Sequence, residues 1–280
     1  MDNWRDYVEG RSSHTVVGSL KVLDTISSPQ LHNHRPLYVC LPPSYAAGER
    51  RYPVIYMQDG QNLFDEPLSY AGEWQVDETL EALSLERIEA IVVGIPNTGI
   101  HRIDEYSPFK DLKLQKGGRG DWYVAFVANT VKPLIDRDFR TLPQREHTGI
   151  FGSSMGGLIS LYAHFCRPEV FGFAGVMSPS FWFAKEAIFP YVQQATAKPG
   201  RIYLDTGTHE GRVKRADTAS PHKYTSIYLT AIRHMRDLLE QKGYRSGHEL
   251  HYVEEENGLH NEAAWSRRLP DALRFLLAQK

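Results

Sequence analysis

The chain has 280 residues, of which 41% are hydrophobic and 24% charged, and its formal net charge is -2. A chain of this length can bury a substantial core as one α/β domain. The near-neutral charge argues against nucleic acid as the main partner, because phosphate binding requires a basic face. No apolar run approaches the roughly 20 residues that span a bilayer, and the first residues lack the layout of a signal peptide. We therefore expect a single domain over residues 1–280 that is soluble and cytoplasmic and has no membrane partner.

The first third of the chain is strand-like. Apolar alternation runs over about 16–26, and a second apolar run at 37–41 ends in two prolines. A third run at 53–57 is followed by the Asp-Gly turn signal at 59–60. We expect the first two strands to add an antiparallel edge to the sheet. The two cysteines, Cys40 and Cys166, both lie in apolar segments and are expected to be reduced.

Strands and helices alternate from residue 53 onward. The expected helices are 74–83, 122–138, 185–194, 220–243 and a C-terminal region kinked or divided at Pro270, and the expected strands are 88–95, 147–151, 171–177, 201–204 and 249–253. Between them, residues 96–120 form a long polar loop of a kind that is usually functional or mobile. This alternation predicts an α/β fold with a mostly parallel central sheet and helices on both faces.

Residues 150–157 read Ile-Phe-Gly-Ser-Ser-Met-Gly-Gly. They contain G-x-S-x-G with Ser154 at the centre, whereas Ser153 would need a glycine at the position of Phe151. The motif falls between an expected strand and an expected helix, which is the context that exposes a nucleophile on a strained turn. The pattern therefore predicts that Ser154, and not Ser153, is a nucleophile.

A serine nucleophile needs a base, and the base must be held by a third group. In folds with this turn, the partners follow in the order serine, acid, histidine, each at the end of a later strand. His260 comes directly after the last expected strand and before the last helix, so it is the expected base. His222, at a helix start, is the topological rival.

The acid is expected after the strand at 201–204. Asp205 stands at the end of that strand, Glu210 follows a glycine turn, and Asp217 lies further along the same loop. Spacing alone does not choose among these three carboxylates.

An oxyanion hole needs two backbone N–H groups directed at the developing negative charge. The residue after the nucleophile, Met155, supplies the first expected amide, and Gln61, after the turn at 59–60, supplies the second. The histidines at 32, 34 and 209 lack further ligands at a useful spacing. The sequence therefore implies no metal and no organic cofactor.

Several segments together resemble the esterase D-like family of the α/β-hydrolase superfamily, whose members include siderophore trilactone esterases, feruloyl and acetylxylan esterases, S-formylglutathione hydrolases and mycolyltransferases. The resemblance covers most of the chain from about residue 35. The matching segments are 52–64, Trp74 with 76–79, 91–97, Arg102 with 105–108, 150–158, 178–180, and 258–260 with Trp265.

The resemblance implies an α/β-hydrolase fold, and it favours Glu210 over Asp205 because Gly207-Thr-His-Glu210 is similar to the family's acid-bearing turn. It also supports Gln61 and Met155 as the oxyanion amides. Within the family, the 59–65 stretch and the Arg102 segment look most like uncharacterised bacterial and siderophore-type esterases.

These observations predict a serine esterase that cleaves a small-molecule carboxylic ester through an acyl-enzyme, with a triad of Ser154, Glu210 and His260. The side chains expected to line a substrate pocket are Trp74, Arg102, Tyr106, Phe181 and Trp182. Two alternatives stay open: an acyltransferase with the same triad, and a non-catalytic binding protein on a hydrolase fold. The oligomeric state is not indicated.

Overall fold

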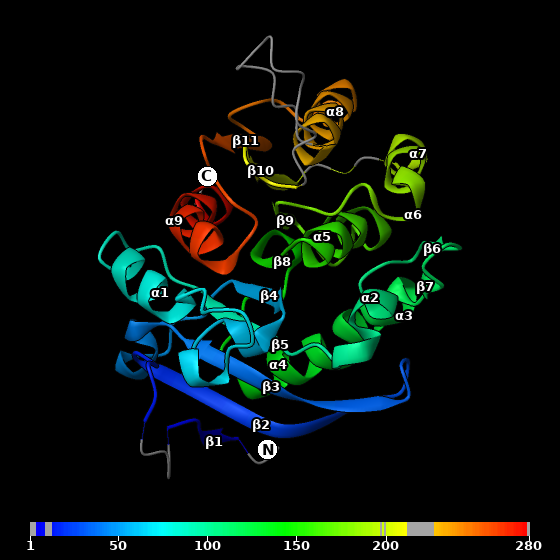
Figure 1. Ribbon diagram of the computed structural model, residues 1–280. Helices are drawn as coiled ribbons and strands as arrows, with labels where there is room; N and C mark the ends of the chain where they lie inside the picture. The colour runs from blue at the N-terminus through cyan, green and yellow to red at the C-terminus, as the bar shows by residue number, and fades with distance from the viewer. Residues whose placement is uncertain (1–3, 9–12, 197, 199, 212–226, 279–280) are drawn as a thin grey trace.

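A nine-stranded sheet forms the centre of the computed structural model, which describes residues 4–8, 13–196, 198, 200–211 and 227–278 (Figure 1). In spatial order its strands are β1 (Arg5–Asp6), β2 (Ser19–Ser28), β3 (Asn33–Leu41), β5 (Ile91–Ile95), β4 (Val54–Gln58), β8 (Thr148–Ser153), β9 (Phe173–Met177), β10 (Arg201–Gly207) and β11 (Leu250–Glu255). The strands from β5 to β11 pair in parallel, whereas β1, β2 and β3 are antiparallel to their neighbours. The expected mostly parallel sheet with an antiparallel N-terminal edge is confirmed.

Helices cover both faces of the sheet. They are α1 (Val76–Ser84), α2 (Arg102–Glu105), α3 (Gly120–Phe126), α4 (Lys132–Asp138), α5 (Met155–Cys166), α6 (Phe183–Glu186), α7 (Ile188–Gln194), α8 (Ile227–Gln241) and α9 (Glu262–Leu277). α1 and α9 pack against one face, and α3, α4, α5, α7 and α8 against the other (Figure 1). Both faces of the sheet are apolar and need to be covered, as β4 illustrates. Its alternate side chains point to opposite faces, so that Val54 and Tyr56 join one core and Ile55 and Met57 the other.

Three segments differ from the sequence expectation. The polar segment 96–120 contains α2 and a two-stranded hairpin, β6 (Lys110–Asp111) with β7 (Lys116–Gly117). The expected helix at 122–138 is α3 and α4 joined by a π-helical turn at Val127–Val131. Pro270 lies inside α9, which continues through it as one helix. The first part of the helix expected at 220–243 lies outside the described residues.

No helix in the described ranges combines the length and the apolar character that crossing a membrane requires. Cys40, on β3, is buried, and Cys166, at the end of α5, is partly buried. Both are free thiols, as expected.

Because β4, β8, β10 and β11 run in the same direction, their carboxyl ends meet at one edge of the sheet. Ligands of open α/β sheets bind outside this edge. The loop after β4 carries Gln61, the turn after β8 carries Ser154, and the loops after β10 and β11 carry Glu210 and His260. The fold thus brings segments that are far apart in the sequence to one edge.

Candidate active site

Ser154 occupies a sharp turn between β8 and α5. Its backbone angles are φ 57 and ψ -121, in a region that residues other than glycine rarely adopt. The turn is tight because glycines flank it: a Cβ atom at Gly152 would lie 2.9 Å from the Gly156 carbonyl carbon. The Ser154 amide donates to the Met177 carbonyl at 3.0 Å, which fixes the turn against β9. This is the strand-turn-helix geometry that the motif predicted for Ser154.

His260 and Glu210 lie side by side at the ends of two neighbouring strands. His260 Nδ1 is 3.0 Å from Glu210 Oε2, and the His260 side chain is 25% exposed while Glu210 is fully buried. Glu210 Oε1 accepts hydrogen bonds from the Gly207 amide at 2.7 Å and from Ser178 Oγ at 2.5 Å. With Nδ1 bound to the carboxylate, Nε2 is the ring nitrogen left to accept a proton.

The Ser154 hydroxyl lies 3.1 Å from Ser180 Oγ. Among the described residues it makes no hydrogen bond to His260. Hydrogen bonds between catalytic groups are often long in structures without substrate and tighten when substrate binds.

Asp205 stands at the end of β10 but is turned away from the histidine. Its Oδ1 accepts the Ser178 amide at 2.9 Å, and its Oδ2 lies 2.9 Å from Arg268 Nε. Burial raises the pKa of Asp205 to about 7, although Arg268 and the Ser178 amide oppose the rise. Of these two carboxylates, Glu210 is therefore the one that contacts His260. The other sequence candidates, Asp217 and His222, lie outside the described residues.

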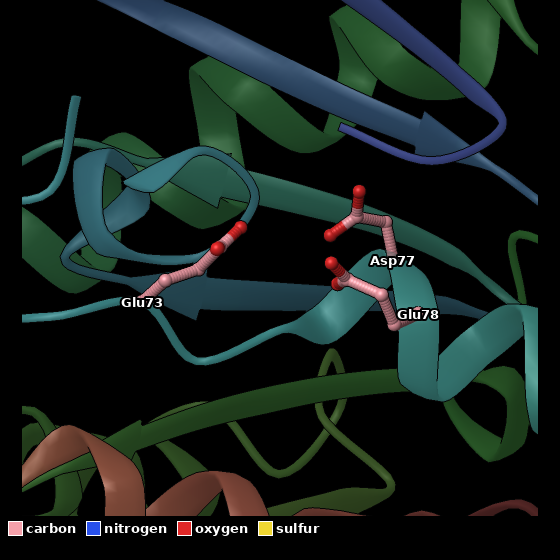
Figure 2. A group of neighbouring side chains, drawn as sticks. All are labelled: Glu73, Asp77 and Glu78. Atoms are coloured by element: carbon pink, nitrogen blue, oxygen red, sulfur yellow. The ribbon is translucent and has the colours of Figure 1, made fainter. Parts of the chain in front are cut away.

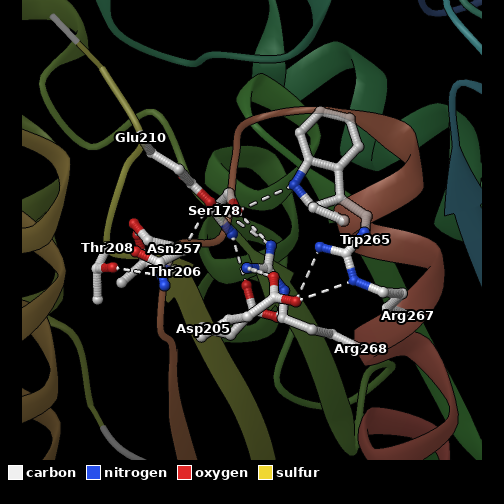
Figure 3. Close-up of polar contacts among 12 residues, drawn as sticks. Ser178, Asp205, Thr206, Thr208, Glu210, Asn257, Trp265, Arg267 and Arg268 are labelled. Atoms are coloured by element: carbon white, nitrogen blue, oxygen red, sulfur yellow. Dashed lines mark hydrogen bonds and ion pairs between the residues drawn. The ribbon is translucent and has the colours of Figure 1, made fainter.

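Arg268 and Ser178 support Glu210, the partner of His260 (Figure 3). The sequence analysis missed Arg268, and it included Ser178 only in the matching segment 178–180 without a role. Arg268, on α9, is 5% exposed and donates to Ser178 Oγ at 2.8 Å. Trp265 Nε1 donates to the same oxygen at 3.0 Å. One signal could have found Arg268: it lies one helical turn after Trp265, on the apolar stripe of the last helix, and a charge on a core-facing stripe needs a buried partner.

The loop after β4 is rigidly held. Asp59 has φ 54 and receives two hydrogen bonds of 2.7 Å from Arg102, through Nε and Nη2. The Asp59 amide donates to the Tyr106 hydroxyl at 3.1 Å, and Asn97 Nδ2 donates to Asp59 Oδ1 at 2.7 Å. Beyond it, Gly60 packs so closely on β5 that a Cβ atom there would lie 2.5 Å from the Gly94 carbonyl carbon.

The expected oxyanion residues follow this loop and the nucleophile turn. Gln61 lies within a short 3-10 turn (Gly60–Asn62), and its side-chain oxygen accepts the Asn97 amide at 3.2 Å. Met155 is the first residue of α5, where backbone N–H groups have no partner within the helix. A Cβ atom at Gly156 would lie 3.8 Å from Asp59 Oδ2, so the start of α5 and the β4 loop are close neighbours.

The expected pocket residues are mostly structural, which corrects the sequence analysis. Tyr106 and Phe181 are fully buried, and Trp74 is 3% exposed and packs against Trp265 with ring centroids 5.5 Å apart. Arg102 is bound to Asp59 by both nitrogens of its fork. Tyr106, Phe181 and Trp74 therefore offer almost no surface to a substrate, whereas the Arg102 side chain is 26% exposed.

Trp182 is different because it is 39% exposed. Its ring centroid lies 6.4 Å from that of Tyr228, which in turn lies 5.0 Å from the His260 ring. An aromatic surface thus extends from the histidine over the sheet edge. The sequence analysis did not single out Tyr228.

A second group of carboxylates lies outside this site. Glu73, Asp77 and Glu78 converge at the start of α1, with carboxylate oxygens within 4.8 Å of one another (Figure 2). Such a group can hold a cation or share protons. Burial, followed by repulsion from Glu78, raises the pKa of Glu73 to about 7. Burial also raises the pKa of Asp77 to about 8, against the Val17 amide that stabilises its charged form.

These raised pKa values predict a stability that depends on pH. Such a carboxyl group binds its proton more tightly in the folded state than in the unfolded state, where its pKa is roughly 4. Its contribution to stability is complete below the unfolded pKa and is lost as the pH rises through the folded pKa. The free energy of unfolding should therefore fall between about pH 5 and pH 8. Asp77→Asn should flatten this fall in urea titrations, whereas the exposed Glu240→Gln should not. Equal slopes for Asp77→Asn and the wild type would contradict the assignment.

Comparison with known proteins agrees with the fold and the site geometry. The family model described as "Putative esterase" matches residues 28–276. The chain belongs to this family. It is 27% identical over 249 residues to the uncharacterized protein YbbA of Bacillus subtilis, an alignment that covers 87% of this chain and 92% of the relative. It is 26% identical to an iron(III) enterobactin esterase of Dickeya dadantii, with 98% of this chain and 58% of that protein covered.

Solved structures show the same architecture. The crystal structure of the BES protein from Bacillus cereus has a TM-score of 0.72 and 19% identity, over 96% of this chain and 98% of that one. An IroE-like serine hydrolase from Shewanella oneidensis has a TM-score of 0.70 and 20% identity, over 93% of this chain and 82% of that one, so the expected α/β fold class is confirmed. Family and relatives together identify the protein as a carboxylic ester hydrolase.

Proposed function

We propose that this esterase works through an acyl-enzyme, with Ser154 as nucleophile, His260 as general base and Glu210 as the acid that orients His260. The observation that carries the proposal is the strained turn at Ser154, placed at the same sheet edge as a histidine whose Nδ1 lies 3.0 Å from a buried glutamate. A serine hydroxyl is a weak nucleophile, and this arrangement supplies the base and the group that holds it.

In the first half of the reaction, His260 Nε2 takes the hydroxyl proton as Ser154 Oγ bonds to the ester carbonyl carbon. The carbonyl oxygen becomes negatively charged, and the amides of Gln61 and Met155 stabilise it. The tetrahedral intermediate then collapses, the bond to the alcohol oxygen breaks, and His260 returns its proton to the leaving alcohol. In the second half, His260 activates water in the same way, and the acid leaves from Ser154.

The electrostatics favour the charged histidine that this cycle needs. Glu210 is fully buried, so its charge acts on His260 across a region of low dielectric constant. Its second oxygen is occupied by the Gly207 amide and Ser178, which leaves Oε2 directed at the histidine. Glu210 therefore orients the ring and stabilises the imidazolium form.

For the substrate, we propose a small-molecule ester whose acyl or alcohol part carries an aromatic ring. Trp182 is 39% exposed and contacts Tyr228, which contacts His260, so a flat ring could stack there. Relatives named as siderophore esterases and as an endo-1,4-beta-xylanase/feruloyl esterase support testing catechol and feruloyl esters.

An ester panel tests this function. The panel should contain the aliphatic esters methyl acetate, methyl butyrate and methyl octanoate, together with methyl ferulate and a catechol trilactone. We expect all short esters to be hydrolysed, with kcat/KM about five- to tenfold higher for the aromatic esters, because stacking is worth about 1–1.4 kcal/mol. Trp182→Ala should remove this preference and leave methyl butyrate turnover within a few fold. A panel with no hydrolysis above the protein-free rate would refute the function, and an aromatic preference that survives in Trp182→Ala would refute the stacking surface.

A further inference from the structure

We propose that Arg268 is a positioning residue that keeps Glu210 charged and directed at His260, with Asp205 as its second counter-charge. The inference rests on the proposed function in one respect, namely that His260 acts as the base. Arg268 touches none of the reacting groups, and it acts through Glu210 and Ser178.

The guanidinium of Arg268 distributes its donors over the ends of three strands (Figure 3). Nε lies 2.9 Å from Asp205 Oδ2, near the end of β10, and Nη1 lies 3.1 Å from Glu255 Oε2 at the end of β11. Nη2 donates to Ser178 Oγ at 2.8 Å and lies 3.5 Å from Glu210 Oε1. Arg268 is 5% exposed, and Asp205 and Glu210 are fully buried, so water screens these charges little.

Ser178 transmits the effect of Arg268 to Glu210. Its oxygen accepts hydrogen bonds from Arg268 and from Trp265 Nε1, which uses both of its acceptor sites. Its single proton is therefore free to donate to Glu210 Oε1, at 2.5 Å. Ser178 has φ 42, a strained value for a residue other than glycine, which is consistent with a position fixed by this network.

The charge balance explains why Arg268 matters. Among the described residues, the titratable and charged groups that interact with Glu210 include Asp205 on β10, His260 before α9 and Arg268 on α9, and Arg268 also pairs with Glu255 on β11. Glu255 is also paired with the exposed Arg267 at 2.9 Å. Arg268 is thus a permanent cation that lies close to both Asp205 and Glu210. Without it, two neighbouring buried carboxylates would share one region of low dielectric constant.

Loss of the cation should change the pH dependence of the reaction in a defined direction. Without Arg268, the buried carboxylates of Asp205 and Glu210 cannot both stay ionised, so the two together retain one proton up to a higher pH than in the wild type. The acid limb of kcat/KM should therefore move up by about 1–3 pH units in Arg268→Met, the size of effect a neighbouring arginine has on a carboxylate. Activity should recover at high pH. A merely structural role would lower activity at every pH and leave the limb in place.

A second substitution separates charge from packing. In Arg268→Met/Asp205→Asn the competing carboxylate is removed, so the acid limb should return toward that of the wild type. Arg268→Lys, which keeps the charge, should leave the limb nearly unmoved even if the overall rate falls. Arg267→Met, a matched loss of the adjacent arginine that does not contact Glu210, should behave as the wild type. If Arg268→Met does not fold, Arg268→Gln, which can still donate to Ser178, makes the same test.

A readout without turnover separates this inference from the proposed function. The low-field NMR signal of the His260 Nδ1 proton reports its hydrogen bond to Glu210 whether or not Ser154 is the nucleophile. As the pH is lowered, we expect this signal to weaken at a higher pH in Arg268→Met than in the wild type. Adding Asp205→Asn to Arg268→Met should restore the wild-type behaviour. An unmoved acid limb, or no rescue by Asp205→Asn, would overturn the role of Arg268. A shifted NMR signal in a protein whose ester hydrolysis does not depend on Ser154 would instead refute the proposed function.

Discussion

Replacing Ser154 with alanine should lower kcat/KM for p-nitrophenyl acetate by roughly 10⁴- to 10⁶-fold, the range known for loss of a serine nucleophile. The reason is chemical, because alanine offers no oxygen to bond to the carbonyl carbon. The substitution removes one atom from a turn held by the Met177 carbonyl and the flanking glycines, so the fold should persist. Steady-state kinetics and a urea unfolding curve check both points.

Ser153→Ala is the matched control. Ser153 is the last residue of β8 and is 4% exposed, one position before the turn. It should keep activity within a few fold of the wild type. If Ser153→Ala were inactive while Ser154→Ala retained turnover, the assignment of the nucleophile would be wrong.

His260→Ala should cost about as much as Ser154→Ala, because serine and base act as one unit and their losses do not add. The double variant should therefore be no less active than either single one. Glu210→Gln should cost about 10²- to 10⁴-fold, since a neutral amide neither stabilises the imidazolium nor selects the tautomer with the proton on Nδ1. Single-turnover and steady-state rates with p-nitrophenyl acetate measure these effects.

Two controls accompany the His260 and Glu210 variants. His209 lies in the same turn as Glu210 but is bound to the Thr208 hydroxyl at 3.2 Å, so His209→Ala should be close to the wild type. Asp205→Asn should cost less than Glu210→Gln, because Asp205 contacts Arg268 and the Ser178 amide and not the histidine. The reverse order would make Asp205 the triad acid.

The sequence predicted the framework of the site because each part depends on local geometry. A strand, a turn that needs glycine and a helix place Ser154 without reference to any distant residue, and parallel strands with helical connections must bring their carboxyl ends to one edge. His260 followed from its place after the last strand. The choice of Glu210 depended on a resemblance, because Asp205 and Glu210 are separated by one short turn.

The parts that the sequence analysis got wrong depend on contacts between distant segments. Arg102 appeared available for a substrate, but the fold brings it to Asp59, 43 positions away in the chain. Tyr106 and Trp74 were expected to line a substrate pocket, yet long-range packing buries them. Arg268 was overlooked because its partners lie on β10 and β11, and no local pattern reveals them.

The most direct test of the mechanism is to find the acyl group on the enzyme. The protein should be mixed with p-nitrophenyl butyrate, quenched in acid within the first turnovers, digested and analysed by mass spectrometry. We expect the peptide spanning residues 150–157 to carry one butyryl group on Ser154 in the wild type and none in Ser154→Ala. Ester hydrolysis at the wild-type rate with an unmodified Ser154, or with butyryl on another residue, would contradict the account.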